Sequence, residues 1–203
     1  MPNWCSTIIT FCSDNKKDLR RFYDFVANVT NNGPSDTSGF GSSWLGNYLE
    51  EVGLNYTKYE CRGSVAYLDE EINEENNSFV LQTDTAWAPM MSMWQAILDE
   101  LKINSIQIFY TAYETGCCIY YTNDPNQLPY FYDICTSLHD DKYKDTIFAY
   151  EGIGEATEED IRENLLVMFP DDAELTTEEL VAKFNEEDVG NIYHYEYVPI
   201  NEL

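Results

Sequence analysis

The chain opens with a strand pattern that is followed directly by a helix pattern. Residues 5–12 are mainly β-branched or aromatic, which predicts a strand. Apolar residues then recur at helical spacing over 14–29, and Ser13 or Asp14 is suited to cap this helix. Its opposite side carries a basic patch, formed by Lys16, Lys17, Arg20 and Arg21. Such a patch is usually a solvated helix face that pairs with nearby acids.

Two further strands and a second long helix are predicted between residues 63 and 102. Strand patterns cover 63–68 and 78–85, with an acidic turn between them. The clearest amphipathic helix of the chain covers 89–102. Pro89 suits the first turn of this helix, where a missing backbone N–H costs nothing.

The remaining elements of this region complete a known strand and helix order. A short helix is expected at 44–52, and strands at 105–113 and 117–122 flank a hairpin turn. Without the short helix and the last strand, the order is the split βαβ order of a ferredoxin-like α/β sandwich. The sequence therefore predicts an α+β protein in which an antiparallel sheet carries both long helices on one face. The term ferredoxin-like names a topology and implies no iron–sulfur cluster.

The composition changes from about residue 145 onwards. Residues 145–203 hold 17 acidic residues and only two basic ones, Arg162 and Lys183. Threonines followed by acids predict helices that begin near 157 and 176, and residues 193–198 predict a final strand. We therefore expect a ferredoxin-like domain at 1–144 and an acidic C-terminal extension at 145–203 that packs on it. Most of the acids fit helix caps and solvated faces.

The net charge of the chain restricts its partners. The 203 residues carry 37 acidic and 11 basic side chains, which gives a net charge of −26. Such a surface repels phosphate, so direct binding to nucleic acid or to an anionic membrane is disfavoured. A partner protein with a basic surface is expected instead, including a surface that normally holds nucleic acid. Alternatively, the acidity only keeps the protein soluble.

The cysteines and the N-terminus predict a cytoplasmic protein. The N-terminus lacks the basic and apolar segments of a signal peptide, and no apolar run approaches the length of a membrane span. The six cysteines contain no Cys-x-x-Cys pair, and the adjacent Cys117 and Cys118 suit neither a shared metal nor a normal disulfide. All six are expected to be reduced thiols.

Several motifs resemble the YubB-like proteins of phages and conjugative plasmids. They are Pro2-Asn3-Trp4-Cys5, Cys61-Arg62-Gly63, Thr83-Asp84-Thr85-Ala86-Trp87-Ala88-Pro89, Glu114-Thr115-Gly116 and Thr122-Asn123-Asp124. The third motif is similar to the family's Thr-x-Thr-Ala-Trp-Ser-Pro pattern, with Ala88 in place of the usual serine. The match covers about residues 2–150. It implies a ferredoxin-like fold and an origin in a mobile genetic element, but no activity, because the family's function is unassigned.

Four residues are candidates for a ligand or interaction cleft. Trp4 and Trp87 flank strand ends, where aromatic side chains either line a cleft or pack a helix onto the sheet. Asp84 and Glu114 are expected at strand ends and are candidates for a carboxylate pair capable of acid–base chemistry. The alternative for the Asp84 region is structural: Asp84 or Thr85 caps the following helix while Trp87 seals the core.

The usual signs of catalysis and of cofactor binding are missing. Cys135 and His139 lack the spacing of a zinc site. The glycines at 39–41 have neither the lysine nor the strand–helix context of a phosphate-binding loop. We therefore expect no catalytic residue, no cofactor and no metal. The sequence favours a non-enzymatic protein and leaves an enzyme open as the alternative.

Two functions remain open. The leading hypothesis is a binding protein of a mobile element that acts on a partner protein through its acidic surface. An inhibitor or a nucleic-acid mimic is the sharpest form of this hypothesis. The alternative is a small-ligand-binding protein or an enzyme with a cleft near Asp84 and Trp87.

Overall fold

The structure is a computed structural model, in which the chain forms two compact units. It describes residues 3–33, 40–114, 116, 119–125, 132–136, 144, 146–149, 153–187 and 190–203. The first unit comprises 1–124 together with 198–203, and the second comprises 125–197. Each unit has a hydrophobic core of its own.

The first unit combines a sheet with three α-helices. Its elements are, in chain order, β1 (Trp4–Cys12), α1 (Lys16–Asn32), α2 (Gly46–Glu51), the 3-10 helix η1 (Tyr56–Lys58), β2 (Gly63–Leu68), β3 (Ser78–Ala86), α3 (Ser92–Glu100), β4 (Gln107–Glu114) and β5 (Ile119–Thr122). The strands of this unit follow the order β2-β3-β1-β4-β5 in the sheet, and the short strand β9 (Glu196–Tyr197) belongs to the segment counted with the second unit. The central strand β1 pairs antiparallel with β3 and with β4. The α+β class is therefore confirmed.

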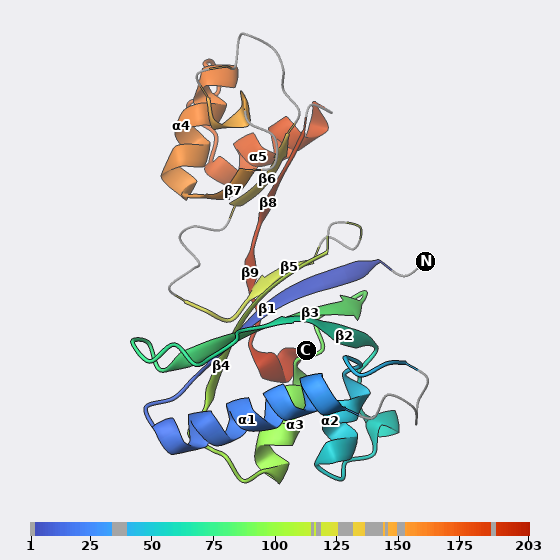
Figure 1. Cartoon of the computed structure of the whole chain (residues 1–203). Coiled ribbons are helices and arrows are strands. Elements are labelled where there is room, and N and C mark those ends of the chain that lie inside the picture. Colours follow the sequence, from blue (N-terminus) through green and yellow to red (C-terminus); the bar gives the residue numbers. More distant parts are fainter. Residues whose placement is uncertain are drawn as a thin grey trace. The chain divides into compact units, whose positions relative to one another are not determined.

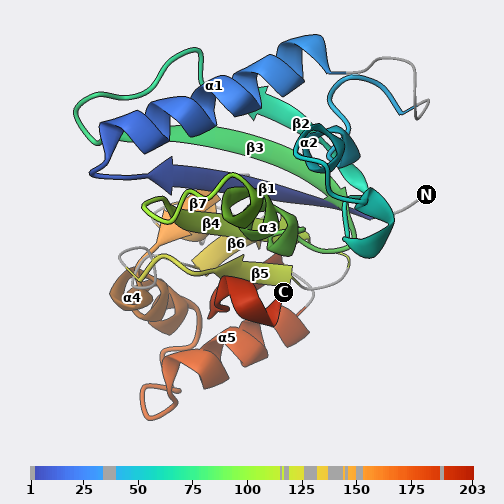
Figure 2. The ribbon, with the colours of Figure 1, turned by 90° about the horizontal axis from the view of Figure 1, so that it is seen from below.

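The helices of this unit lie together on one face of the sheet, as Figures 1 and 2 show. The alternation of burial along β1 explains the arrangement. Cys5, Ile9 and Phe11 are fully buried and point toward the helices, whereas Ile8 on the other face is exposed. The apolar side of α1 meets this buried face, and the ring of Phe22 lies 5.0 Å from that of Phe11. The prediction that both long helices cover one face is confirmed.

The starts of the two long helices differ from those predicted. Asn15 is the N-cap of α1, because its side chain accepts a hydrogen bond from the Asp18 N–H at 3.3 Å. Ser13 instead accepts from the N–H of Asn15, so neither Ser13 nor Asp14 caps the helix. Helix α3 begins at Ser92, which places Pro89 in the preceding turn and not in the helix.

The last six residues return to the first unit. The N–H of Val198 donates to the Thr122 carbonyl at 2.8 Å, and the Tyr110 hydroxyl donates to the Val198 carbonyl at 2.6 Å. Ile200 and Leu203 pack against the core of the first unit. The second unit is therefore inserted in the chain between β5 and this returning segment.

The second unit is a small α+β unit. A three-stranded sheet of order β7-β6-β8 is formed by β6 (Tyr132–Thr136), β7 (Ile153–Ala156) and β8 (Gly190–His194). It is joined by α4 (Glu158–Met168) and α5 (Thr177–Glu186). Thr157 and Thr176 cap these helices in complete capping boxes, as the sequence predicted. The boundary between the units, after Asp124, precedes the change in composition at 145.

Two parts of the second unit were not anticipated from the sequence. Strands β6 and β7 were not predicted, and the final strand predicted at 193–198 is wrong in its bounds. That segment contains the end of β8 and the separate short strand β9, with Tyr195 between them. A core around Phe148, Ile161 and Phe184 holds the unit together.

Other expectations concern the surface and the thiols. Lys16 and Arg20 of the basic patch form ion pairs with Glu74 at 3.1 and 3.7 Å, as expected for a solvated helix face. Within the described residues, none of the helices has both the length and the apolar character that crossing a membrane requires. Cys12 and Cys61 are free thiols, whereas Cys117 and Cys118 lie outside the described residues.

Candidate binding groove

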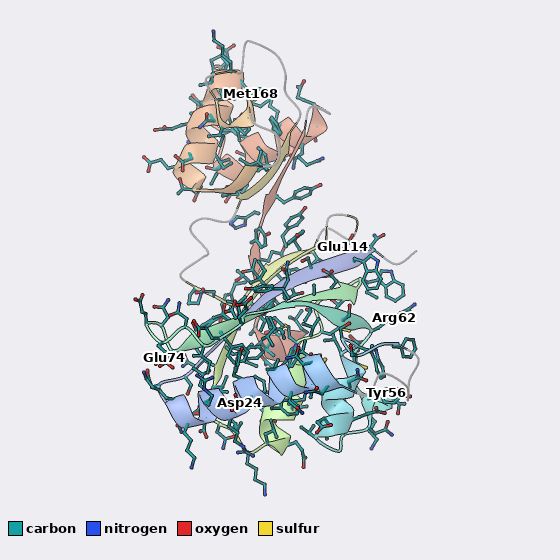
Figure 3. All side chains as sticks on the ribbon, in the orientation of Figure 1. Asp24, Tyr56, Arg62, Glu74, Glu114 and Met168 are labelled. Carbon is teal, nitrogen blue, oxygen red and sulfur yellow. The ribbon has the colours of Figure 1, made fainter. Side chains whose placement is uncertain are left out.

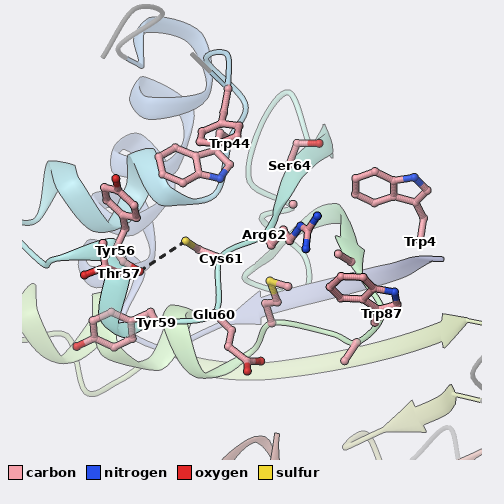
Figure 4. A pocket seen from close by; sticks show the side chains of 15 residues that line it. Trp4, Trp44, Tyr56, Thr57, Tyr59, Glu60, Cys61, Arg62, Ser64 and Trp87 are labelled. Carbon is pink, nitrogen blue, oxygen red and sulfur yellow. Dashed lines mark hydrogen bonds between the residues drawn. The ribbon is translucent and has the colours of Figure 1, made fainter. Parts of the chain in front are cut away.

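An aromatic groove of about 1020 Å³ lies at one end of the sheet of the first unit (Figure 4). Its lining comes from four segments: the start of β1, the stretch before α2, the stretch from η1 into β2, and the turn between β3 and α3. Figure 3 shows Tyr56 and Arg62 at this end of the unit, away from Glu74. We call this groove, with the lining from these four segments, the aromatic groove.

Trp87 stands in the turn between β3 and α3 with an unusual backbone. Its φ angle is +69°, a left-handed conformation that is rarely adopted by a bulky residue. The surrounding backbone holds this turn, since the Trp87 N–H donates to the Asn3 carbonyl at 2.9 Å. The Thr85 hydroxyl also closes the turn by donating to the Ala88 carbonyl at 2.7 Å. Strain of this kind persists only where the neighbouring structure enforces it, and it is frequent at binding sites.

The indole rings of Trp4 and Trp87 line the aromatic groove without being buried. Trp4 is 55% exposed and Trp87 is 47% exposed. The Arg62 guanidinium lies over the Trp87 ring, 4.7 Å from its centroid, which is a cation–π contact. Within the described part of the chain, Arg62 forms no ion pair with a carboxylate. This side of the groove thus presents two half-exposed indole rings and one cation, Arg62, that has no ion-pair partner within the described residues.

The opposite wall is a chain of aromatic contacts. Phe40, which is 68% exposed, lies 4.9 Å from the Trp44 ring, and Trp44 meets Tyr56 edge-on at 5.0 Å. The Trp44 ring lies against the backbone of Gly46, where an added Cβ would come within 2.2 Å of it. A residue without a side chain is therefore required at this point of α2 for the wall to form.

The charged groups of the groove are few. Arg62 is the cation among the lining residues and Glu60 is the carboxylate. Burial raises the pKa of the Cys61 thiol above its usual value, and the charge of Glu50 raises it further. The thiol is therefore protonated at neutral pH and is a poor nucleophile. The described lining residues are therefore suited to stacking and hydrogen bonding.

The structure separates the four residues predicted to share a cleft. Trp4 and Trp87 both line the aromatic groove, but Asp84 and Glu114 do not. Asp84 lies on the face of the sheet without helices, since its neighbours Thr83 and Thr85 point into the core. Glu114 is buried on the other face and accepts a hydrogen bond from the Gly116 N–H at 2.9 Å. The proposed carboxylate pair is therefore wrong.

The structural alternative for the turn is also wrong in its details. The N-cap position of α3 is Met91, so neither Asp84 nor Thr85 caps this helix. Trp87 does not seal the core, because about half of its side chain is accessible. Trp94 of α3 fills that role, as it is almost completely buried against Phe11 and Tyr48.

Sequence reasoning missed most of the residues that line the groove. Arg62 had been noted only as part of the Cys61-Arg62-Gly63 motif. The density of aromatic residues between 40 and 59 was the available signal for Phe40, Trp44 and Tyr56. It does not distinguish groove residues from core residues, because Tyr48 in the same stretch is fully buried.

The residues that the structure describes contain no group of three or more His, Cys, Asp and Glu side chains able to hold a metal ion. His139 lies outside those residues, as does the side chain of Cys135. Comparisons with protein-family models, with curated proteins and with solved structures found no match to the chain. The resemblance to YubB-like proteins rests on its sequence motifs alone.

Proposed function

We propose that this protein is a non-catalytic binding protein that engages a partner protein through the aromatic groove. The observation that carries the proposal is the pair of half-exposed indole rings, Trp4 and Trp87, in one groove. Large aromatic side chains and arginines dominate the energetic centres of protein interfaces. Trp87, with Arg62 stacked on it, presents both residue types in one place.

The net charge of −26 selects a partner with a basic surface. The second unit adds to this field, because the two cations of its helical region serve internal contacts. Arg162 donates to the Ala173 and Leu175 carbonyls, and Lys183 pairs with Asp172. At the start of α4 and α5, the capping boxes use Asp160 and Glu179, and the exposed Glu158, Glu159 and Glu178 are left for solvent or for a partner. An inhibitor that covers a nucleic-acid-binding surface is the sharpest form of the proposal.

The fold, origin and compartment are part of the same proposal. The order β2-β3-β1-β4, with α1 and α3 on one face, supports a ferredoxin-like topology for the first unit. The sequence motifs support a YubB-like protein of a phage or plasmid that acts in the cytoplasm of its host.

A pull-down from bacterial lysate tests the proposal. The wild-type protein should retain a partner at low salt and release it as the salt concentration rises, because screening weakens charge attraction. The double variant Trp4→Ala/Trp87→Ala should lose the partner. Tyr113→Ala is the matched control, since Tyr113 is an exposed aromatic residue that does not line the groove. Retention of the same partner by the double variant, or recovery of no partner at low salt, would refute the proposal.

A small-ligand site is the second candidate, favoured by the volume of the groove. About 1020 Å³ lies at the upper end of the range for small-molecule sites. A metabolite that raises the melting temperature of the wild-type protein, and not that of Trp87→Ala, would favour this candidate over a protein partner.

A further inference from the structure

We propose that the occupant of the aromatic groove is an extended, proline-containing peptide segment that carries lysine or arginine. This inference rests on the proposed function, because it takes the partner to be a protein. It adds which part of the partner is recognised and by what chemistry. Three properties of the groove lead to it: its aromatic surfaces, its free hydrogen-bond donors and its charge.

The aromatic surfaces suit proline rings and an extended backbone. Trp4 and Trp87 present indole faces on one side, and Phe40 extends the aromatic wall on the other. Polyproline II segments dock onto aromatic-lined grooves because they are already extended before binding and lose little conformational entropy.

The donors of Arg62 suit the carbonyl groups of such a segment. Its guanidinium is held over Trp87, and none of its N–H groups donates to an acceptor in the described residues. Arginine has five N–H donors, and the stacked ring leaves those at the edge of the guanidinium accessible. A polyproline II backbone makes no internal hydrogen bonds, so its carbonyls are available as acceptors.

The charge of the site decides between cationic and anionic segments. Arg62 and Glu60 are the charged residues of the lining, and their charges cancel. The first unit itself holds 18 acidic and 7 basic side chains, and this net charge of −11 repels an acidic segment and attracts a basic one. Glu60 is exposed and has no ion-pair partner within the described part of the chain, so it is positioned to meet a lysine or arginine of the ligand.

Selection from a phage-displayed library of random peptides tests the inference. The full-length wild-type protein should enrich sequences that combine proline with lysine or arginine. In the strongest of these peptides, replacing the proline by glycine or the basic residue by glutamate should weaken binding about tenfold or more, measured by fluorescence anisotropy. Enrichment of acidic or proline-free sequences, or of none, would overturn the inference.

Variants of the groove provide the second arm. The double variant Trp4→Ala/Trp87→Ala should lose the selected peptide, whereas Tyr113→Ala should bind it as the wild type does. Glu60→Lys should weaken a basic peptide and leave its neutral analogue unaffected. Circular dichroism and thermal unfolding identify variants that remain folded, and a folded double variant that still binds the peptide contradicts the inference.

The two proposals fail in different ways. If the lysate pull-down returns a partner that depends on the groove while the library returns no linear peptide, the partner docks through a folded surface. The proposed function then stands and the peptide inference is wrong. If neither experiment gives binding that depends on Trp4 and Trp87, both are wrong.

Discussion

Trp87 has a strained backbone conformation, and its side chain is not part of the hydrophobic core. Its φ of +69° is enforced by hydrogen bonds from the neighbouring turn, and about half of the indole is accessible. A left-handed conformation costs a non-glycine residue on the order of 1–3 kcal/mol. Because about half of the indole lies outside the core and lines the groove, we expect this side chain to serve recognition more than folding.

This interpretation predicts how substitutions at Trp87 affect stability. Trp87→Ala should lower the free energy of unfolding by less than about 2 kcal/mol, whereas truncation of a fully buried tryptophan costs about 3–5 kcal/mol. Trp87→Gly should be no less stable than Trp87→Ala, because glycine adopts a positive φ without strain. Urea unfolding of the three proteins measures both differences. A loss of about 3 kcal/mol or more in Trp87→Ala would show that the residue is structural.

At the scale of single residues, the sequence identified part of the site. Trp4 and Trp87 were found because tryptophans at strand ends are conspicuous. Asp84 and Glu114 were misplaced because their relation depends on strand register and on which face each side chain occupies. Asp84 belongs to the alternate residues of β3 that are partly exposed, whereas Glu114 belongs to the alternate residues of β4 that are buried. Arg62 was missed because its stacking on Trp87 requires two segments to be folded together.

At the scale of elements, α2 illustrates how a short helix positions a groove wall. Trp44 precedes the helix and folds back over Gly46, the first helical residue. The ring is held there by contacts with Phe40 and Tyr56. The wall therefore depends on the absence of a side chain at the helix start.

Gly46→Ala should consequently disrupt the wall. The new Cβ would displace the Trp44 ring, and overpacking of this kind costs about 1–3 kcal/mol. The same substitution in a Trp44→Ala background should cost much less, because the clashing ring is gone. A double-mutant cycle by thermal unfolding measures this coupling. Equal costs in both backgrounds would show that the glycine is needed for another reason.

Strands of the first unit were easier to predict than its helix starts. The pattern of β2 gave the observed bounds, because β-branched and aromatic residues there are flanked by polar turns. The start of α3 was misjudged because Pro89 belongs to the turn that holds Trp87, and the helix begins only at Ser92. Strands β6 and β7 carry weak patterns, and they are fixed by pairing with each other and with β8.

At the scale of the whole molecule, the second unit is an insertion with its own core. The chain leaves the first unit after Asp124 and rejoins it at Val198. These points lie close together in space, because Val198 hydrogen-bonds to Thr122. The core of the second unit is drawn entirely from residues between them.

The second unit should therefore be removable. A variant in which about ten Gly and Ser residues replace 125–197 should keep the first unit folded, since such a linker spans about 17 Å on average. Its thermal unfolding should remain cooperative and its aromatic groove should still bind any peptide selected by the wild type. A variant that also lacks Val198–Leu203 should be less stable, because Ile200 and Leu203 leave the core. A disordered circular dichroism spectrum for the first variant would show that the units depend on each other.

The segment Val198–Leu203 also determines which contacts carry a force that is applied between the two ends of the chain. When a pull is applied between Asn3 and Leu203, both points of attachment belong to the first unit. The load then runs through β1 and through the contacts that Val198, Ile200 and Leu203 make with that unit. Only after this segment has detached does force reach the second unit, which is shielded until then. In a single-molecule stretching experiment, the second unit should therefore always unfold after Val198–Leu203 has detached from the first unit.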